Sequence, residues 1–106
     1  GNIVNAPLWA GAGSDEFRTA MREVVLPAME NFGPDLVMIS AGFDAHRRDP
    51  LAQLELETED FVWATEEIRK IAEKKCDGRL ISTLEGGYAL QALGDSAAAH
   101  TRVLMS

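Results

Sequence analysis

Two short segments of this 106-residue chain carry side chains that could do chemistry. In the first, residues 40–51, Asp44 and His46 stand two positions apart. If this segment is extended, both side chains point to the same side and could share a metal ion, because carboxylate oxygen and imidazole nitrogen are common zinc ligands. In the alternative interpretation, Asp44 caps a turn and His46 faces solvent.

The second segment, residues 84–88, ends in Tyr88, which directly follows Gly86 and Gly87. The two glycines let the backbone approach a ligand closely, and the hydroxyl of Tyr88 could donate a hydrogen bond to a developing oxyanion. The alternative is a tyrosine that only packs against the helix after it.

Alternating strands and helices are predicted to position both segments. Apolar runs predict strands at residues 3–8, 36–39 and 80–84, and the second is expected to be buried on both faces. Apolar residues at helical spacing predict helices that begin at an N-cap Ser14, near Thr58 and near residue 90. Pro27 predicts a kink or an early end within the first helix. The first helix is predicted to stop at Gly33 and the second at Gly78.

This order of elements predicts an α/β fold, a parallel sheet flanked by helices, with residues 1–106 as a single unit. Ligands bind beyond the carboxyl ends of such strands, so the loops after Leu8, Ile39 and Leu84 are the candidate regions. The glycine-rich loop at 10–14 lacks the third glycine of a dinucleotide fingerprint and the lysine of a phosphate loop. It favours a plain turn, with nucleotide binding through Gly11 and Gly13 as the alternative.

Composition excludes several classes of function. The formal net charge of −7 opposes direct nucleic-acid binding, and no apolar run is long enough to cross a membrane. The lone Cys76 cannot form an intrachain disulfide and is expected to be a small buried hydrophobe, so we expect a reduced, cytoplasmic setting. The first residue is not methionine, which suggests that the chain begins inside something larger.

Taken together, residues 40–46 (Ser-Ala-Gly-Phe-Asp-Ala-His), 49–51 (Asp-Pro-Leu) and 84–88 (Leu-Glu-Gly-Gly-Tyr) resemble the histone deacetylase family. The likeness is strongest to class II and bacterial members, including acetylpolyamine amidohydrolases, and extends over essentially the whole chain. It implies the C-terminal portion of a catalytic domain with the arginase-like α/β fold and one catalytic zinc ion.

The resemblance also implies roles for single residues. Asp44 would be the last of three zinc ligands, the other two coming from an upstream Asp-x-His motif, and His46 would not be a ligand. Tyr88 would stabilise the oxyanion of the tetrahedral intermediate. Leu51, Gly86 and Gly87 would shape the substrate channel.

The family's catalytic histidine pair has no counterpart here, because the chain contains only His46 and His100. His100 is expected to be structural or solvent-facing. We therefore predict part of a zinc-dependent deacetylase for acetyl-lysine or acetylated polyamines, inactive in isolation because one carboxylate holds zinc weakly. The alternative is a non-catalytic module that self-associates through an exposed sheet edge.

Overall fold

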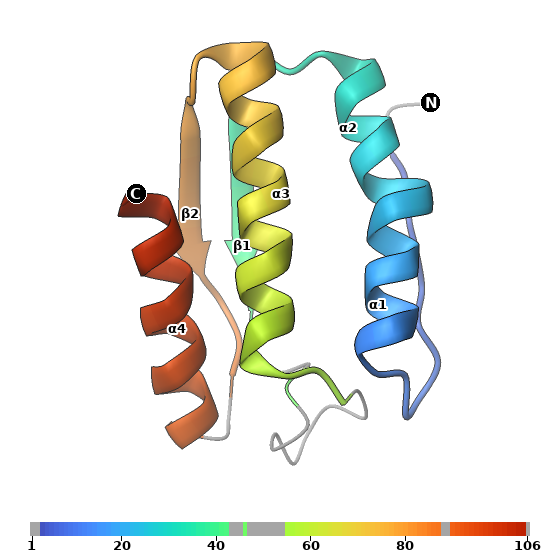
Figure 1. Ribbon diagram of the computed structural model, residues 1–106, viewed down its shortest axis with the longest axis vertical. Helices are drawn as coiled ribbons and strands as arrows, with labels where there is room; N and C mark the ends of the chain where they lie inside the picture. The colour runs from blue at the N-terminus through green and yellow to red at the C-terminus, as the bar shows by residue number, and fades with distance from the viewer. Residues whose placement is uncertain (1–2, 43–45, 47–54, 88–89, 106) are drawn as a thin grey trace.

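The computed structural model describes residues 3–42, 46, 55–87 and 90–105 and contains two parallel strands packed against helices (Figure 1). The elements in chain order are α1 (Ser14–Ala20), a π-helical turn (Met21–Val25), α2 (Leu26–Phe32), β1 (Val37–Ala41), α3 (Thr58–Cys76), β2 (Leu80–Leu84) and α4 (Leu90–Met105). Helices α3 and α4 lie on one face of the sheet, and α1 and α2 run beside α3. The predicted parallel sheet flanked by helices is confirmed.

The first helical stretch is distorted at Pro27 but does not end there. A π-helical turn directly precedes α2, and Pro27 lies in the first turn of α2. Proline has no backbone N–H and its ring crowds the carbonyl four residues earlier, so a wider turn at this point relieves both conflicts. The stretch ends at Gly33, whose φ of 64° is left-handed, as predicted. The N-cap is Gly13 rather than the expected Ser14.

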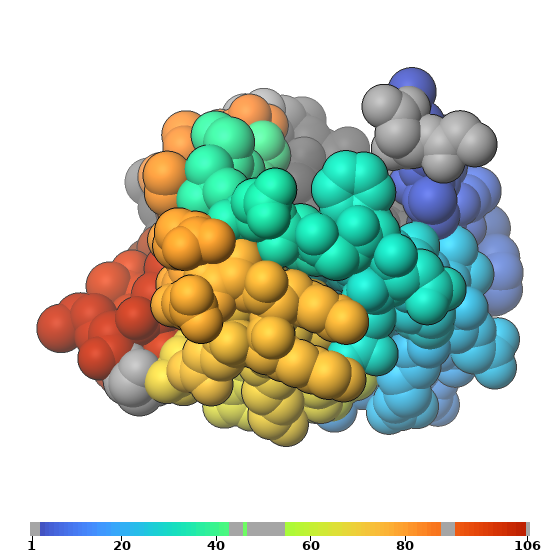
Figure 2. Space-filling view, turned by 90° about the horizontal axis from the view of Figure 1, so that it is seen from above, coloured from blue at the N-terminus to red at the C-terminus, as the bar shows by residue number. Residues whose placement is uncertain are grey.

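Helix α3 begins and ends where the sequence predicts. A reciprocal capping box between Glu57 and Asp60 starts it before Thr58, so the first backbone N–H groups have acceptors. At the other end, Asp77 and Gly78 adopt left-handed conformations with φ of 55° and 79°. Its C-terminal end also lies beside that of α2, where Lys74 pairs with Glu30 at 2.9 Å (Figure 2).

The expected strand at residues 3–8 is wrong. This segment has no regular secondary structure, and most of its residues are exposed. A strand is stabilised by a hydrogen-bonded neighbour, and among the described residues the only ladder joins β1 to β2. Pro7 further weakens pairing because it lacks a backbone donor.

The expectation that the strand at 36–39 is buried on both faces is also wrong. Val37 and Ala41 are buried against the helices, whereas Met38, on the opposite face, is 71% exposed. The neighbouring strand shows the same asymmetry, since Ile81 is 49% exposed. Within the described ranges, all the helices that contact the sheet cover the same face. Because successive side chains of a strand point to opposite faces, only every second residue is buried.

The core lies between the sheet and the helices. One cluster, formed by Ala41, Leu56 and Phe61, sits at the carboxyl end of β1. A second cluster, at the other end, combines Val37 with Ala72 and Cys76. Cys76 is only 2% exposed, which confirms the expected buried thiol.

Candidate functional site

The strand register brings the starts of the two chemically interesting segments together. Ala41 and Leu84, the last residues of β1 and β2, are paired, and the N–H of Glu85 donates a 2.9 Å hydrogen bond to the carbonyl of Ala41. Neighbouring strands are about 4.8 Å apart, so the segments that follow β1 and β2 start side by side. Asp44 follows Ala41 by three positions and Tyr88 follows Leu84 by four.

Three of the predicted site residues, Asp44, Leu51 and Tyr88, lie outside the described residues, so their roles stay predictions. Gly86 and Gly87 are described and are both partly buried. Gly87 has a φ of 138°, a conformation that L side chains rarely adopt, so the backbone here requires glycine. The local geometry is therefore compatible with the close backbone approach that the two glycines were predicted to allow.

His46 is buried, and the interpretation that it faces solvent is wrong. Its side chain is 2% exposed, its Nε2 lies 3.4 Å from Thr58 Oγ1, and its ring stacks on Phe61 with centroids 6.3 Å apart. Its backbone forms a bridge to Leu56. Among the described residues no group of three His, Cys, Asp or Glu side chains could hold a metal ion.

Asp60, in the first turn of α3, is a buried acidic group that accepts hydrogen bonds from three donors. Its carboxylate is 1% exposed and accepts hydrogen bonds from Ser14 Oγ (2.5 Å), the Glu57 N–H (2.9 Å) and Arg18 Nε (3.0 Å). Burial raises the pKa of Asp60, but these donors outweigh that effect and hold its pKa below the usual value. The Asp three positions after Glu57 is a capping-box signal that could have pointed to it.

His100 joins three elements and lies between the helices and the sheet. Its Nδ1 is 2.8 Å from Thr65 Oγ1 and its Nε2 is 2.8 Å from Ser82 Oγ on β2. The Thr65 hydroxyl donates to the carbonyl of Phe61 at 2.6 Å, so it must accept from Nδ1–H. The neutral ring then accepts from Ser82. Burial lowers the pKa of His100, and the expected structural role is supported while the solvent-facing one is wrong.

The glycine-rich loop has a structural function in the chain. Gly11 has a φ of 86°, and Ala12, which is fully buried, donates to the carbonyl of Trp9 and accepts from the N–H of Glu55 at 2.8 Å. Gly13 then caps α1. The carbonyl of Glu55 also faces Gly13, and carbonyl oxygens are unfavourable surroundings for a phosphate, so the turn interpretation fits better than nucleotide binding.

This parallel α/β fold, with two motif-bearing loops that leave the sheet together, matches one protein family. Residues 1–104 match the histone deacetylase domain family. The chain therefore belongs to the histone deacetylase family.

Individual relatives span very different sources. Histone deacetylase 14, chloroplastic, of Arabidopsis thaliana is 39% identical over 105 residues, which cover 99% of this chain and 25% of the relative. The histone deacetylase-like amidohydrolase of Pseudomonas aeruginosa is 43% identical over 86 residues, covering 81% of this chain and 23% of the relative. The chain thus spans about a quarter of the length of these relatives.

Solved structures agree on the fold. The HD domain of HDA15 superposes with a TM-score of 0.87 at 37% identity, over 95% of this chain and 28% of that one. The histone deacetylase Clr3 superposes with a TM-score of 0.85 at 34% identity, over 95% and 16% of the two chains. The deacetylase fold implied by the motifs is therefore confirmed. Among the described residues, no helix is both long and apolar enough to span a bilayer.

Proposed function

We propose that this chain is the C-terminal part of a zinc-dependent deacetylase that hydrolyses the amide of acetyl-lysine or of acetylated polyamines. The observation that supports it most directly is the pairing of Ala41 with Leu84, which starts the two motif-bearing segments at neighbouring positions. Family membership supports hydrolysis of an amide, since one relative is named an amidohydrolase.

Each candidate residue has a distinct role in this proposal. Asp44 would supply one zinc ligand, and Tyr88 would donate a hydrogen bond to the oxyanion that forms from the substrate carbonyl. Leu51 would line the channel for the acyl-amine chain, and Gly86 and Gly87 would keep it narrow. Zinc, when bound, polarises the amide carbonyl and activates the attacking water.

A zinc site needs more ligands than the candidate site of this chain offers. Catalytic zinc is held by three protein side chains, whereas the candidate site contains one carboxylate, and the described residues contain no three-residue metal group. His46 does not add a ligand to it, because its Nε2 is directed at Thr58 inside the core. We therefore expect weak zinc binding and no turnover from the isolated chain.

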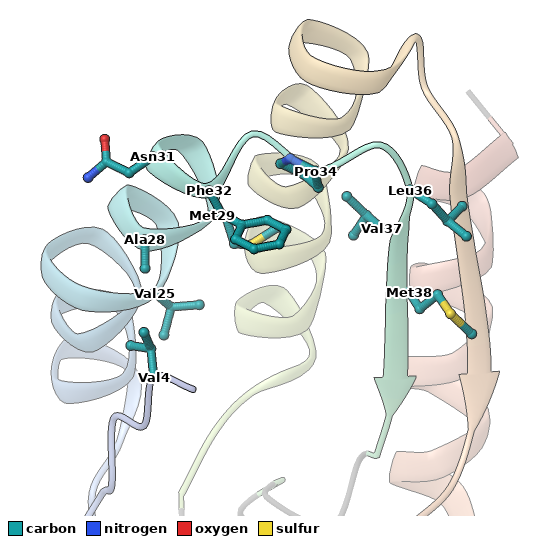
Figure 3. A pocket seen from close by; sticks show the side chains of 10 residues that line it. All are labelled: Val4, Val25, Ala28, Met29, Asn31, Phe32, Pro34, Leu36, Val37 and Met38. Atoms are coloured by element: carbon teal, nitrogen blue, oxygen red, sulfur yellow. The ribbon is translucent and has the colours of Figure 1, made fainter. Parts of the chain in front are cut away.

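An uncovered apolar face supports the idea that the chain works as part of a larger domain. A groove of about 600 Å³ runs between α2, β1 and the N-terminal segment (Figure 3). Its lining includes Phe32 and Met38, which are 73% and 71% exposed, together with Val4 at 53% and Leu36 at 45%. Soluble proteins rarely leave such a large apolar cluster open to solvent; it is usually covered by another part of the protein or by a partner. The relatives are about four times as long as this chain, so they contain enough polypeptide to cover it.

Turnover of acetyl-lysine peptide and acetylated polyamine by the complete enzyme tests the proposal. Asp44→Asn should abolish zinc retention, and Tyr88→Phe should lower kcat by about a hundredfold or more while zinc is kept, because one oxyanion donor is lost. Asp77→Asn is the matched control, since that side chain is 94% exposed and asparagine tolerates its left-handed backbone. Full activity in Asp44→Asn, or chelator-sensitive turnover by the isolated chain, would refute the proposal.

The same apolar groove also favours a second candidate, a non-catalytic module that associates with itself. This candidate predicts a mass that rises with concentration in light scattering and falls to that of one chain in Met38→Lys. The deacetylase proposal instead predicts that Met38 is covered by other parts of the same molecule in the complete enzyme. Met38→Lys should then leave the mass measured by light scattering unchanged.

A further inference from the structure

His46 is held by contacts that no catalytic role explains. Its ring is 2% exposed and stacks on Phe61, with the two ring planes 18° apart. Its backbone bridges to Leu56, which is 1% exposed and belongs to the core cluster at the carboxyl end of β1. Burying an imidazole is costly unless its nitrogens have hydrogen-bond partners, so the contacts of this ring matter for stability.

A chain of polar contacts extends from this ring across two helices. His46 Nε2 lies 3.4 Å from Thr58 Oγ1 at the start of α3, and Thr58 Oγ1 lies 3.3 Å from Ser96 Oγ on α4. Ser96 is fully buried, and Thr58 is partly buried. The contacts therefore tie position 46 to the two helices that cover the sheet.

The start of α3 is itself a rigid attachment point. Glu57 and Asp60 cap the helix immediately around Thr58, and Asp60 is bonded in turn to Ser14 and Arg18 of α1. His46 is thus connected to a network that includes α1, α3 and α4. Position 44 is only two residues away along the chain, and two residues span at most about 7 Å.

We propose that His46 is a positioning residue, which fixes the segment that carries the metal-ligand candidate Asp44 to the start of α3 through Thr58 and Ser96. This inference rests on the proposed function for the role of Asp44, but the anchoring itself rests on the contacts of His46. Its function would resemble that of the outer groups of metal sites, which orient the ligands without touching the metal.

The decisive variants change the anchor without touching Asp44. Thr58→Val replaces the hydroxyl by a methyl group of similar shape, and His46→Leu removes the ring. His46→Gln is the rescue variant, because its terminal amide can reach a position close to that of Nε2. Ala72→Gly is the control, since Ala72 is fully buried near the far end of α3 and its loss should lower stability without affecting the anchor.

Three measurements on the complete enzyme separate positioning from general stability. The first is hydrogen exchange of backbone amides in residues 43–54 of the metal-free protein, which should become about tenfold faster in Thr58→Val and His46→Leu. The second is zinc retention against a chelator, which should weaken about tenfold, as for other outer groups of metal sites. The third is kcat, which should fall with little change in KM. His46→Gln should recover part of each loss, and Ala72→Gly should leave all three near wild type.

The outcomes distinguish failure of this inference from failure of the proposed function. A wild-type complete enzyme without zinc or turnover would refute the proposed function, while exchange in the metal-free protein would still report on the anchor. If Thr58→Val and His46→Leu leave exchange and zinc retention unchanged, the positioning role is refuted. It is refuted equally if Ala72→Gly, at the same loss of melting temperature, produces the same changes.

Discussion

Replacing Asp60 by asparagine should destabilise the fold more than any other single charge removal among the described residues. The substitution keeps the shape of the side chain but turns one carboxylate oxygen into an amide nitrogen. Three donors point at that carboxylate, from Ser14, Glu57 and Arg18. An asparagine can accept from donors only through its one oxygen, so at least one donor then meets another donor.

The size of the effect follows from this geometry. The best arrangement of the new amide keeps its oxygen towards Ser14 and Glu57 and turns its nitrogen towards Arg18. The charge-assisted bond to Arg18 is then lost, at about 1.5–3 kcal/mol, and the other two bonds become neutral and weaker by roughly 0.5 kcal/mol each. Relief of the buried charge returns part of this. We expect a net loss of about 3 kcal/mol.

Urea unfolding followed by far-ultraviolet circular dichroism would measure this loss. The control is Glu30→Gln, which removes the same charge from a surface pair with Lys74, where the two side chains are 43% and 64% exposed. Exposed pairs contribute little, so no measurable change is expected there. A loss in Asp60→Asn below about 1 kcal/mol would show that the three bonds do not stabilise the fold as argued.

The pH dependence gives an independent check. Because the pKa of Asp60 is lower in the folded than in the unfolded chain, its ionised form stabilises the fold above the unfolded pKa, near 4. This stabilisation is lost as the pH falls through the folded pKa. The difference between wild type and Asp60→Asn should therefore be constant from about pH 6 to 8 and shrink below about pH 4. A difference that persists unchanged at pH 3 would contradict the assignment.

Three further predictions use other described residues. Because burial lowers the pKa of His100, its unfolded form binds protons more readily, so stability should fall as the pH drops below about 6.5; His100→Gln should flatten this slope in urea unfolding between pH 7 and 5. Gly87→Ala should reduce kcat of the complete enzyme more than Gly86→Ala, because only position 87 has a φ of 138°; equal effects would exclude backbone strain as the cause. Cys76, at 2% exposed, should react with a thiol reagent only at the rate of unfolding, and rapid labelling of the native protein would show that the second core cluster opens.

Much of the architecture could be predicted because it depends on local signals. The strand at 80–84 and the helix from Thr58 to Cys76 were both predicted closely, since an apolar run, a capping residue and a left-handed stop act within a few residues of one another. The parallel pairing followed from the long helical connection between the strands. The metal and catalytic roles of Asp44 and Tyr88 stay predictions, because both lie outside the described residues.

The errors concern features that depend on distant parts of the chain. Met38 is apolar, as a doubly covered strand predicts, but burial of its face depends on what packs there, which local pattern cannot reveal. The interpretation that His46 faces solvent, one of the two considered, is wrong because the residues that bury it are distant in sequence. Its environment is built by Leu56, Thr58 and Phe61, at least ten positions away. Only a tertiary contact decides such a case.

The contact between His100 and Ser82 bears on how faithfully the two strands align. Side chains alternate between the faces of a strand, so sliding β2 by one residue would turn Ser82 away from α4 and bring an aliphatic or threonine neighbour beneath the imidazole. In the slip that places Ile81 there, the ring would lose the hydroxyl that donates to Nε2 in a dry environment, whereas a ladder of backbone bonds alone is indifferent to such a shift. The histidine thus disfavours this misaligned pairing, which would displace the start of the loop after β2 by about 3.3 Å.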